Sequence, residues 1–138
     1  MAKPVLIDTG PLVAILCRED AQHHSCVDAL KGIQEDLVTC WPVITEAVHL
    51  LSGRVDRIRS LLMMLAGGAV TCVDMPTAAA TWIDGFYHRF ADQVPDLADA
   101  ALMYLAERDE IEVVFTLDRR DFAIYRTSAN RSLRVIPE

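Results

Sequence analysis

Short apolar runs alternate with amphipathic segments along most of the chain, a pattern that predicts strands alternating with helices. Prolines at positions 11, 42 and 76 each suit the first turn of a helix. The expected strands are residues 5–7, 37–41, 69–73, 112–117 and 133–136. The expected helices are residues 20–32, 55–66 and 96–108, one from Pro11 towards Cys17, one from Pro42 carrying Ile44, Val48 and Leu51 on one face, and one of about 14 residues from Pro76.

This alternation favours an α/β fold in which helices cover both faces of a mostly parallel sheet of about five strands. Ligands of such sheets bind beyond the carboxyl ends of the strands. At 138 residues the chain is long enough for a hydrophobic core of its own, and we expect a single domain over residues 1–138.

Four acidic residues stand in apolar surroundings, where an unpaired carboxylate is unfavourable. Asp8 follows the first strand and Asp118 ends the strand 112–117, so both belong at one edge of the sheet. Glu46 and Asp99 are expected in the first turns of their helices, which would begin at the same edge. Gathered carboxylates repel each other unless a cation neutralises them. The pattern therefore predicts a site with oxygen ligands for Mg²⁺ or Mn²⁺.

Three of these acids also have a structural interpretation, and the sequence leaves it open. The alternatives are a helix cap or Asx turn for Asp8, a turn paired with Arg119 or Arg120 for Asp118, and a partly exposed helical position for Glu46. Asp96, one helical turn before Asp99, fits a helix N-cap that could also face the site. Asp121 is interpreted as a surface residue.

Charge is distributed unevenly along the chain. The net charge of −7 does not favour nucleic acid over the whole surface. Residues 119–134, however, hold five arginines against one acid, and Arg54, Arg57 and Arg59 form a second basic group. These groups are either solvated surface or phosphate-binding residues beside a metal site.

Other features narrow the class of protein. No apolar run reaches the roughly 18 residues of a membrane span, and the N-terminus has no signal-peptide features. The four cysteines form no CxxC pair and are expected to be reduced and buried, as in a cytoplasmic protein. His23, His24 and Cys26 lack a second ligand pair with zinc-like spacing, and nucleotide-binding glycine motifs are absent.

Four segments taken together resemble a known family. They are DTGPL after the first strand, TEA, LADAALMYLAE and TLDRRDF, in that order. With this order and spacing, residues 5–137 resemble the PIN-domain ribonucleases, most closely the VapC-type toxins of bacterial toxin–antitoxin pairs. The resemblance implies a PIN-like three-layer α/β/α sandwich.

The resemblance also implies roles for individual residues. Asp8, Glu46, Asp99 and Asp118 match the catalytic, metal-binding acids of the family. Thr116 corresponds to a Thr or Ser that often precedes the last acid by two residues. Asp96 falls where many members carry Ser, and it is a possible further ligand.

The implied activity is that of a Mg²⁺-dependent endoribonuclease, with Mn²⁺ able to substitute, that cleaves RNA with a metal-activated water. Arg119, Arg120 and Arg126 are the candidate RNA-binding residues. An antitoxin partner and a homodimer are expected. The dimer interface is placed on the helices around residues 55–65 and 78–90, which include Phe86 and Tyr87.

Two other functions remain open at this point. One is a stand-alone PIN-domain nuclease without an antitoxin, and the other is a metal-binding regulatory or interaction module without nuclease activity. A receiver-like module would need adjacent acids near the first strand, but the segment before Asp8 is PVLI. Four intact acids count against a purely structural interaction protein.

Overall fold

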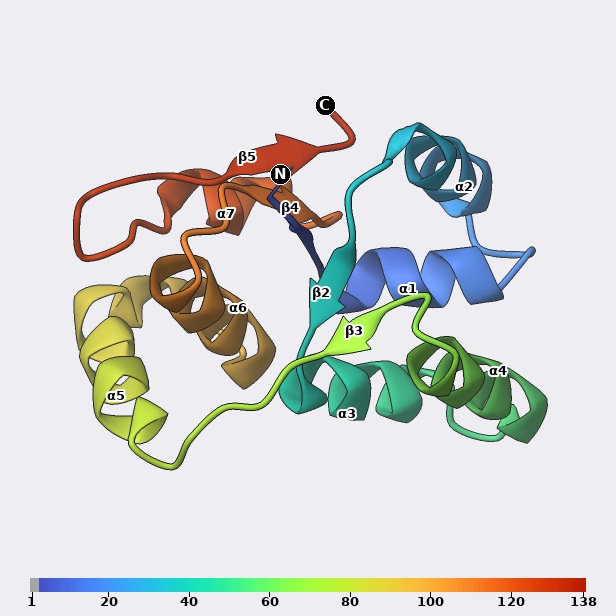
Figure 1. The fold of residues 1–138 in the computed structure, drawn as a ribbon, viewed down its shortest axis with the longest axis horizontal. Coiled ribbons are helices and arrows are strands. Elements are labelled where there is room, and N and C mark those ends of the chain that lie inside the picture. Colours follow the sequence, from blue (N-terminus) through green and yellow to red (C-terminus); the bar gives the residue numbers. More distant parts are fainter. Residues whose placement is uncertain (1–2) are drawn as a thin grey trace.

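A computed structural model describes residues 3–138 (Figure 1). Five parallel strands form one sheet in the order β3-β2-β1-β4-β5. The strands are β1 (Val5–Ile7), β2 (Leu37–Thr39), β3 (Thr71–Cys72), β4 (Val113–Phe115) and β5 (Arg134–Ile136). The predicted parallel sheet of about five strands is therefore confirmed, and every strand points its carboxyl end towards the same edge.

Helices cover both faces of this sheet, so the fold has the three α/β/α layers expected of a PIN-like domain. Figure 1 places α5 and α6 on one side of the strands and α1, α2 and α4 on the other. The helices are α1 (Thr9–Leu16), α2 (His23–Gly32), α3 (Trp41–Leu50), α4 (Val55–Ala66), α5 (Ala79–Arg89), α6 (Leu97–Arg108) and α7 (Arg119–Ile124), with a 3₁₀ turn η1 (Ala91–Gln93).

The central strands are apolar on both faces because helices pack on both. All three residues of β1 are buried, and Val114 and Phe115 of β4 are fully buried. Consecutive β-branched and aromatic residues are typical of a parallel strand covered on two sides. The edge strand β3 is only two residues long, which leaves little unpaired backbone at that edge.

Helix α6 packs with eight of its twelve residues buried. The side chains of Ala98, Ala100 and Ala101 are small and buried, which allows α6 to pack closely against its neighbours, including α3 and α5. Asp99 stands among these alanines and is buried with them. The packing of α6 therefore brings one carboxylate into the interior of the protein.

Most predicted elements are present, with differences at their ends. The helix expected at residues 55–66 has those bounds, whereas the one expected from residue 20 begins at His23, because Asp20 accepts the amide of Gln22 in a turn (2.8 Å). The helix expected from Pro76 begins at Ala79, after a turn closed by the hydrogen bond from Ala79 N to Pro76 O. Neither η1 nor α7 was predicted.

The cysteines and the membrane prediction can also be compared with the structure. All four thiols are free, and Cys17, Cys26 and Cys40 are buried as expected. The predicted burial was wrong for Cys72, which is only partly buried because it lies on the edge strand β3. Within residues 3–138, no helix is long and apolar enough to cross a membrane. The single domain over residues 1–138 stays a prediction.

Candidate active site

Adjacent parallel strands bring Asp8 and Asp118 to the same edge of the sheet. Ile7 of β1 is in register with Phe115 of β4, and the Asp8 amide donates to the Phe115 carbonyl at 2.9 Å. Asp8 is the N-cap of α1 and Asp118 the N-cap of α7, so each acid stands where a strand gives way to a helix. This part of the predicted convergence is confirmed by the sheet topology.

Asp8 is held by hydrogen bonds to both carboxylate oxygens. Its Oδ1 accepts the Thr9 amide at 2.7 Å, and its Oδ2 accepts the Thr116 hydroxyl at 2.8 Å. The Thr116 oxygen in turn accepts the Asp118 amide at 3.0 Å. Burial raises the pKa of Asp8, and these hydrogen bonds oppose the shift. Thr116, which is fully buried, therefore links the first and last acids of the site.

Asp99 is a strongly perturbed carboxyl group of the site. It lies in the first turn of α6, is 5% exposed, and accepts the Tyr125 hydroxyl at Oδ2 (3.1 Å). Burial raises the pKa of Asp99 to about 8, and the negative charges of Asp8 and Asp118 act in the same direction. A group with this pKa favours either a proton or a cation at neutral pH.

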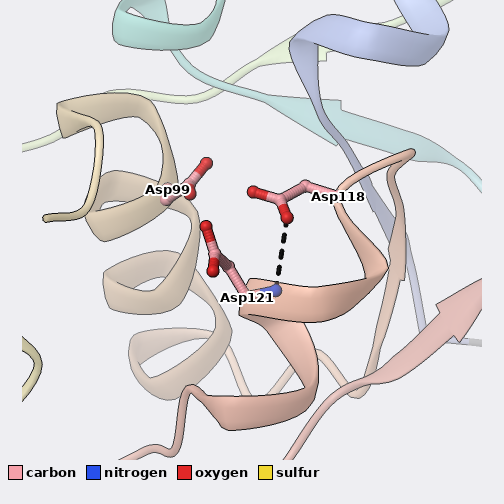
Figure 2. A group of neighbouring side chains, drawn as sticks. All are labelled: Asp99, Asp118 and Asp121. Carbon is pink, nitrogen blue, oxygen red and sulfur yellow. Dashed lines mark hydrogen bonds between the residues drawn. The ribbon is translucent and has the colours of Figure 1, made fainter. Parts of the chain in front are cut away.

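Asp121 joins Asp99 and Asp118 in one cluster, which corrects its interpretation as a surface residue (Figure 2). One carboxylate oxygen from each of these three residues lies within 4.8 Å of the others. Asp118 Oδ1 accepts the Asp121 amide at 3.2 Å. Asp118 is the N-cap of α7, and the first turn of this helix brings the backbone of Asp121 close to the Asp118 side chain. The spacing D-x-x-D is that of a helix capping pair, and this signal was present in the sequence.

Glu46 and Asp96 are the other two predicted acids, and neither belongs to the cluster. Helix α3 begins at Trp41, directly after β2, so Glu46 lies in the second turn and the expected first-turn position was wrong. Burial is the main cause that raises the pKa of Glu46, and the negative charges of Asp96 and Asp8 act in the same direction. Asp96 occupies the predicted N-cap position of α6, although its side chain makes no capping hydrogen bond there. Metal coordination by these two acids stays a prediction.

The donor set fits a hard divalent cation. The three clustered ligand groups are all carboxylates, and burial and mutual repulsion raise the pKa of Asp99 and of Asp118. Such groups disfavour their own ionised form until a cation compensates the charge. Oxygen ligands suit Mg²⁺ and Mn²⁺, so Asp99, Asp118 and Asp121 could hold the ion, with Asp8 beside them.

The three candidate RNA-binding arginines occupy different environments. Arg120 lines a hollow of about 370 Å³ beside Asp118 and Asp121. Arg119 donates to the carbonyl of Pro137, and Arg126 donates to three carbonyls at the end of α7, those of Ala123, Ile124 and Tyr125. Arg120 is therefore the arginine best placed next to the acids. RNA binding by all three stays a prediction.

Tyr125 is a site residue that sequence reasoning missed. It is fully buried, and its hydroxyl reaches Asp99 across 26 residues of sequence separation. No local motif signals such a contact, since a tyrosine after a short helix is equally typical of a core position. Another hollow, of about 740 Å³, lies at the opposite edge of the sheet, beside residues such as Glu112 and Arg134 that precede or begin strands.

Comparison with known proteins shows the family of this chain. The family model of the PIN domain matches residues 5–128, which is most of the chain. The chain belongs to the PIN-domain family. The family that the sequence motifs indicated is therefore confirmed, whereas the roles of the site residues stay a prediction.

Two relatives of this PIN domain are informative. Ribonuclease VapC26 of Mycobacterium tuberculosis is 30% identical over 135 residues, which cover 96% of this chain and all of the relative. The crystal structure of VapC20 from Mycobacterium tuberculosis, described as a sarcin-ricin loop cleaving toxin, matches with a TM-score of 0.80 over 87% of this chain and 94% of that chain. At 14% identity this second likeness shows the shared fold.

The raised pKa of Asp99 predicts that stability falls with rising pH when metal is absent. The ordinary pKa is 3.8 and the folded value about 8, so within this window the folded state holds a proton that the unfolded chain has lost. The free energy of unfolding therefore decreases as the pH rises through this window, and the decrease is complete above it. In EDTA, we expect this PIN domain to melt at a lower temperature at pH 9 than at pH 6.

Asp99→Asn should reduce the loss of stability at high pH. We expect this variant to melt above wild type at pH 9, by roughly 4 °C for each kcal/mol of repulsion relieved. The asparagine oxygen can still accept the Tyr125 hydroxyl. Asp28→Asn, on the exposed side of α2, is the matched control and should follow wild type at both pH values. If Asp99→Asn melts markedly earlier than wild type at pH 9, the carboxylate is structural and the metal-site interpretation is wrong. Thermal melts followed by circular dichroism measure this.

Proposed function

We propose that this PIN domain is a metal-dependent endoribonuclease that hydrolyses phosphodiester bonds of RNA. The observation that carries the proposal is the convergence of Asp99, Asp118 and Asp121 within 4.8 Å, beside the buried Asp8. The identity to a protein named a ribonuclease, over nearly the whole of both chains, supports the substrate class.

The residues of this chain have distinct tasks in such a reaction. Asp99, Asp118 and Asp121 would hold Mg²⁺ or Mn²⁺, with Asp8 and Glu46 as further acids of the site. A divalent ion held by carboxylates activates a water molecule and neutralises charge on the phosphoryl oxygens. Thr116 and the Thr9 amide orient the Asp8 carboxylate, which leaves lone pairs on both oxygens free for a ligand or for a proton from water.

Removing single acids tests the nuclease proposal directly. We expect Asp8→Asn and Asp99→Asn each to lower the rate of cleavage of a labelled RNA at least about 100-fold, because each removes a charge that binds the ion or the water. EDTA should abolish wild-type cleavage, and added Mg²⁺ or Mn²⁺ should restore it. Circular dichroism confirms that the variants are folded.

The control for this experiment is Asp28→Asn, which should cleave like wild type. Cleavage that survives EDTA, or that persists in both acid variants, would contradict a metal-dependent mechanism. A wild-type protein that binds Mn²⁺ but never cleaves RNA would instead support the metal-binding module without nuclease activity.

We further propose that RNA reaches the acids past the start of α7. Arg119 and Arg120 are exposed there, and Arg120 lines the hollow that contains Asp118 and Asp121. Cationic groups that contact phosphates release counterions, so affinity falls as salt rises. A local basic group is needed because the protein as a whole carries a net charge of −7.

The double variant Arg119→Gln/Arg120→Gln should bind RNA more weakly, with a plot of log affinity against log salt that is shallower by about 1.4 units if both arginines contact phosphates. The affinity for Mn²⁺ should stay within about twofold of wild type, since neither side chain is a ligand. Fluorescence anisotropy at several salt concentrations gives the slope. Arg59→Gln/Lys31→Gln, on exposed positions of α4 and α2, is the matched control. An unchanged slope in the first variant would place the RNA elsewhere.

The likeness to VapC proteins supports a toxin role with an antitoxin partner. VapC20, whose fold this chain shares, is described as a toxin. An antitoxin would inhibit by burying apolar surface and placing a cationic side chain among the carboxylates. A hollow of about 590 Å³ beside Trp41, which is 56% exposed at the start of α3, offers such apolar surface. If the product of the neighbouring gene neither binds nor inhibits, the stand-alone nuclease without an antitoxin is the better description.

We also propose a homodimer, with α4 as the main contributor to its interface. Val55 and Met63 on this helix are 64% and 67% exposed, and Leu62 is 40% exposed. Phe86, expected in the interface, is fully buried in the core instead, because α5 turns that face towards α6. Sedimentation equilibrium at micromolar concentration tests the dimer, and a 15.3 kDa species alone would exclude it.

A further inference from the structure

We propose that Tyr125 is a positioning residue, which holds the Asp99 carboxylate in the orientation that binds the metal ion. The inference rests on the proposed function, since it concerns the same acids. It adds a residue that none of the family motifs in the sequence contains. Tyr125 is fully buried, so it does not contact RNA, and it acts through Asp99.

The first support is the hydrogen bond itself. The Tyr125 hydroxyl donates to Asp99 Oδ2 at 3.1 Å, and within residues 3–138 no other side chain donates to this carboxylate. Asp99 is 5% exposed, so little solvent is available to replace the hydroxyl. Loss of this donor would leave a buried carboxylate oxygen without its partner, which is unfavourable and allows the side chain to rotate.

The second support is the rigidity of the donor. The Tyr125 ring packs edge-on against Phe86, Phe90 and Phe122, with centroid separations of 5.1, 5.5 and 5.2 Å. Three aromatic contacts restrict both rotation and displacement of the ring. The position of the Tyr125 hydroxyl is therefore fixed. If the Asp99 carboxylate rotated away, the hydroxyl would not follow, and the hydrogen bond would be lost.

The third support is the position of Tyr125 between the two halves of the cluster. Asp99 lies on α6, whereas Asp118 and Asp121 lie at the start of α7, as Figure 2 shows. Tyr125 directly follows α7, and its amide donates to the Asp121 carbonyl at 3.0 Å. One residue thus contacts Asp121 through its backbone and Asp99 through its hydroxyl. This link opposes the repulsion that would otherwise drive the carboxylates of α6 and α7 apart.

Tyr125→Phe tests the inference, because it removes the hydroxyl and keeps the ring. Isothermal titration with Mn²⁺ should show affinity weakened about 10- to 100-fold, the usual effect of losing a group that orients a metal ligand. In RNA cleavage, kcat should fall while KM for RNA stays unchanged, since Tyr125 touches no substrate. Tyr104→Phe, which removes a hydroxyl from the far half of α6, is the matched control and should change neither quantity.

A merely structural hydroxyl would lower the melting temperature and leave the Mn²⁺ affinity of the folded protein unchanged. Affinity within twofold of wild type in folded Tyr125→Phe would therefore overturn the inference. The proposed function fails differently: in that case wild type itself neither binds Mn²⁺ nor cleaves RNA.

A measurement on wild type covers the case in which the variant does not fold. The chain has three tyrosines, so labelling their ζ carbons with ¹³C gives three resolvable signals. Saturation with Mg²⁺ should shift the signal of Tyr125, whose hydroxyl reports on the charge of Asp99, and leave that of Tyr104 in place. Mg²⁺ binding with no shift at Tyr125 would show that the hydroxyl does not act through the metal ligand.

Discussion

Burial and mutual repulsion of carboxylates gathered at one edge of a parallel sheet are the constraint on which this structure depends. Burial raises the pKa of Asp8 and Asp99, and Asp118 shifts in the same direction. A chain free to move would separate these groups or leave them in water. The fold keeps them together because each is attached to an element whose position the core determines.

The backbone and a few hydroxyls offset part of this repulsion. Asp8 and Asp118 are helix N-caps, and Asp99 lies in the first turn of α6, so all three stand near the positive ends of helix dipoles. Thr116 connects Asp8 to the backbone of Asp118, and Tyr125 holds Asp99. These contacts orient the carboxylates without neutralising them, which is the arrangement a divalent cation would complete.

Charge also explains how an acidic protein could act on RNA. A polyanion would be repelled by an acidic pocket, and a bound divalent ion would offset part of that negative charge. Arg120 lies beside the same acids, so attraction for phosphate is concentrated where the net charge of the chain would otherwise oppose it. The exposed apolar residues of α4, such as Val55 and Met63, lie on a helix that carries none of these acids.

The amino-acid sequence by itself determined the class of fold and half of the site. Alternation of strand and helix patterns implies a parallel sheet, and in such a sheet Asp8 and Asp118 must share an edge, because each lies at the carboxyl end of a strand. Asp99 was predictable from its apolar surroundings, since a carboxylate among alanines requires a partner. The order of the four motifs was enough to indicate the PIN family.

Only the tertiary structure decided the remaining members of the site. Helix α7 has six residues, too few for a hydrophobic period, and packing and capping stabilise it, so the position of Asp121 could not be read from a repeat. Tyr125 meets Asp99 through side-chain packing between segments that are distant in sequence. The rotation of α5 about its axis likewise decided that Phe86 belongs to the core. Local patterns report which residues share a face, whereas the contacts between faces depend on how whole elements pack.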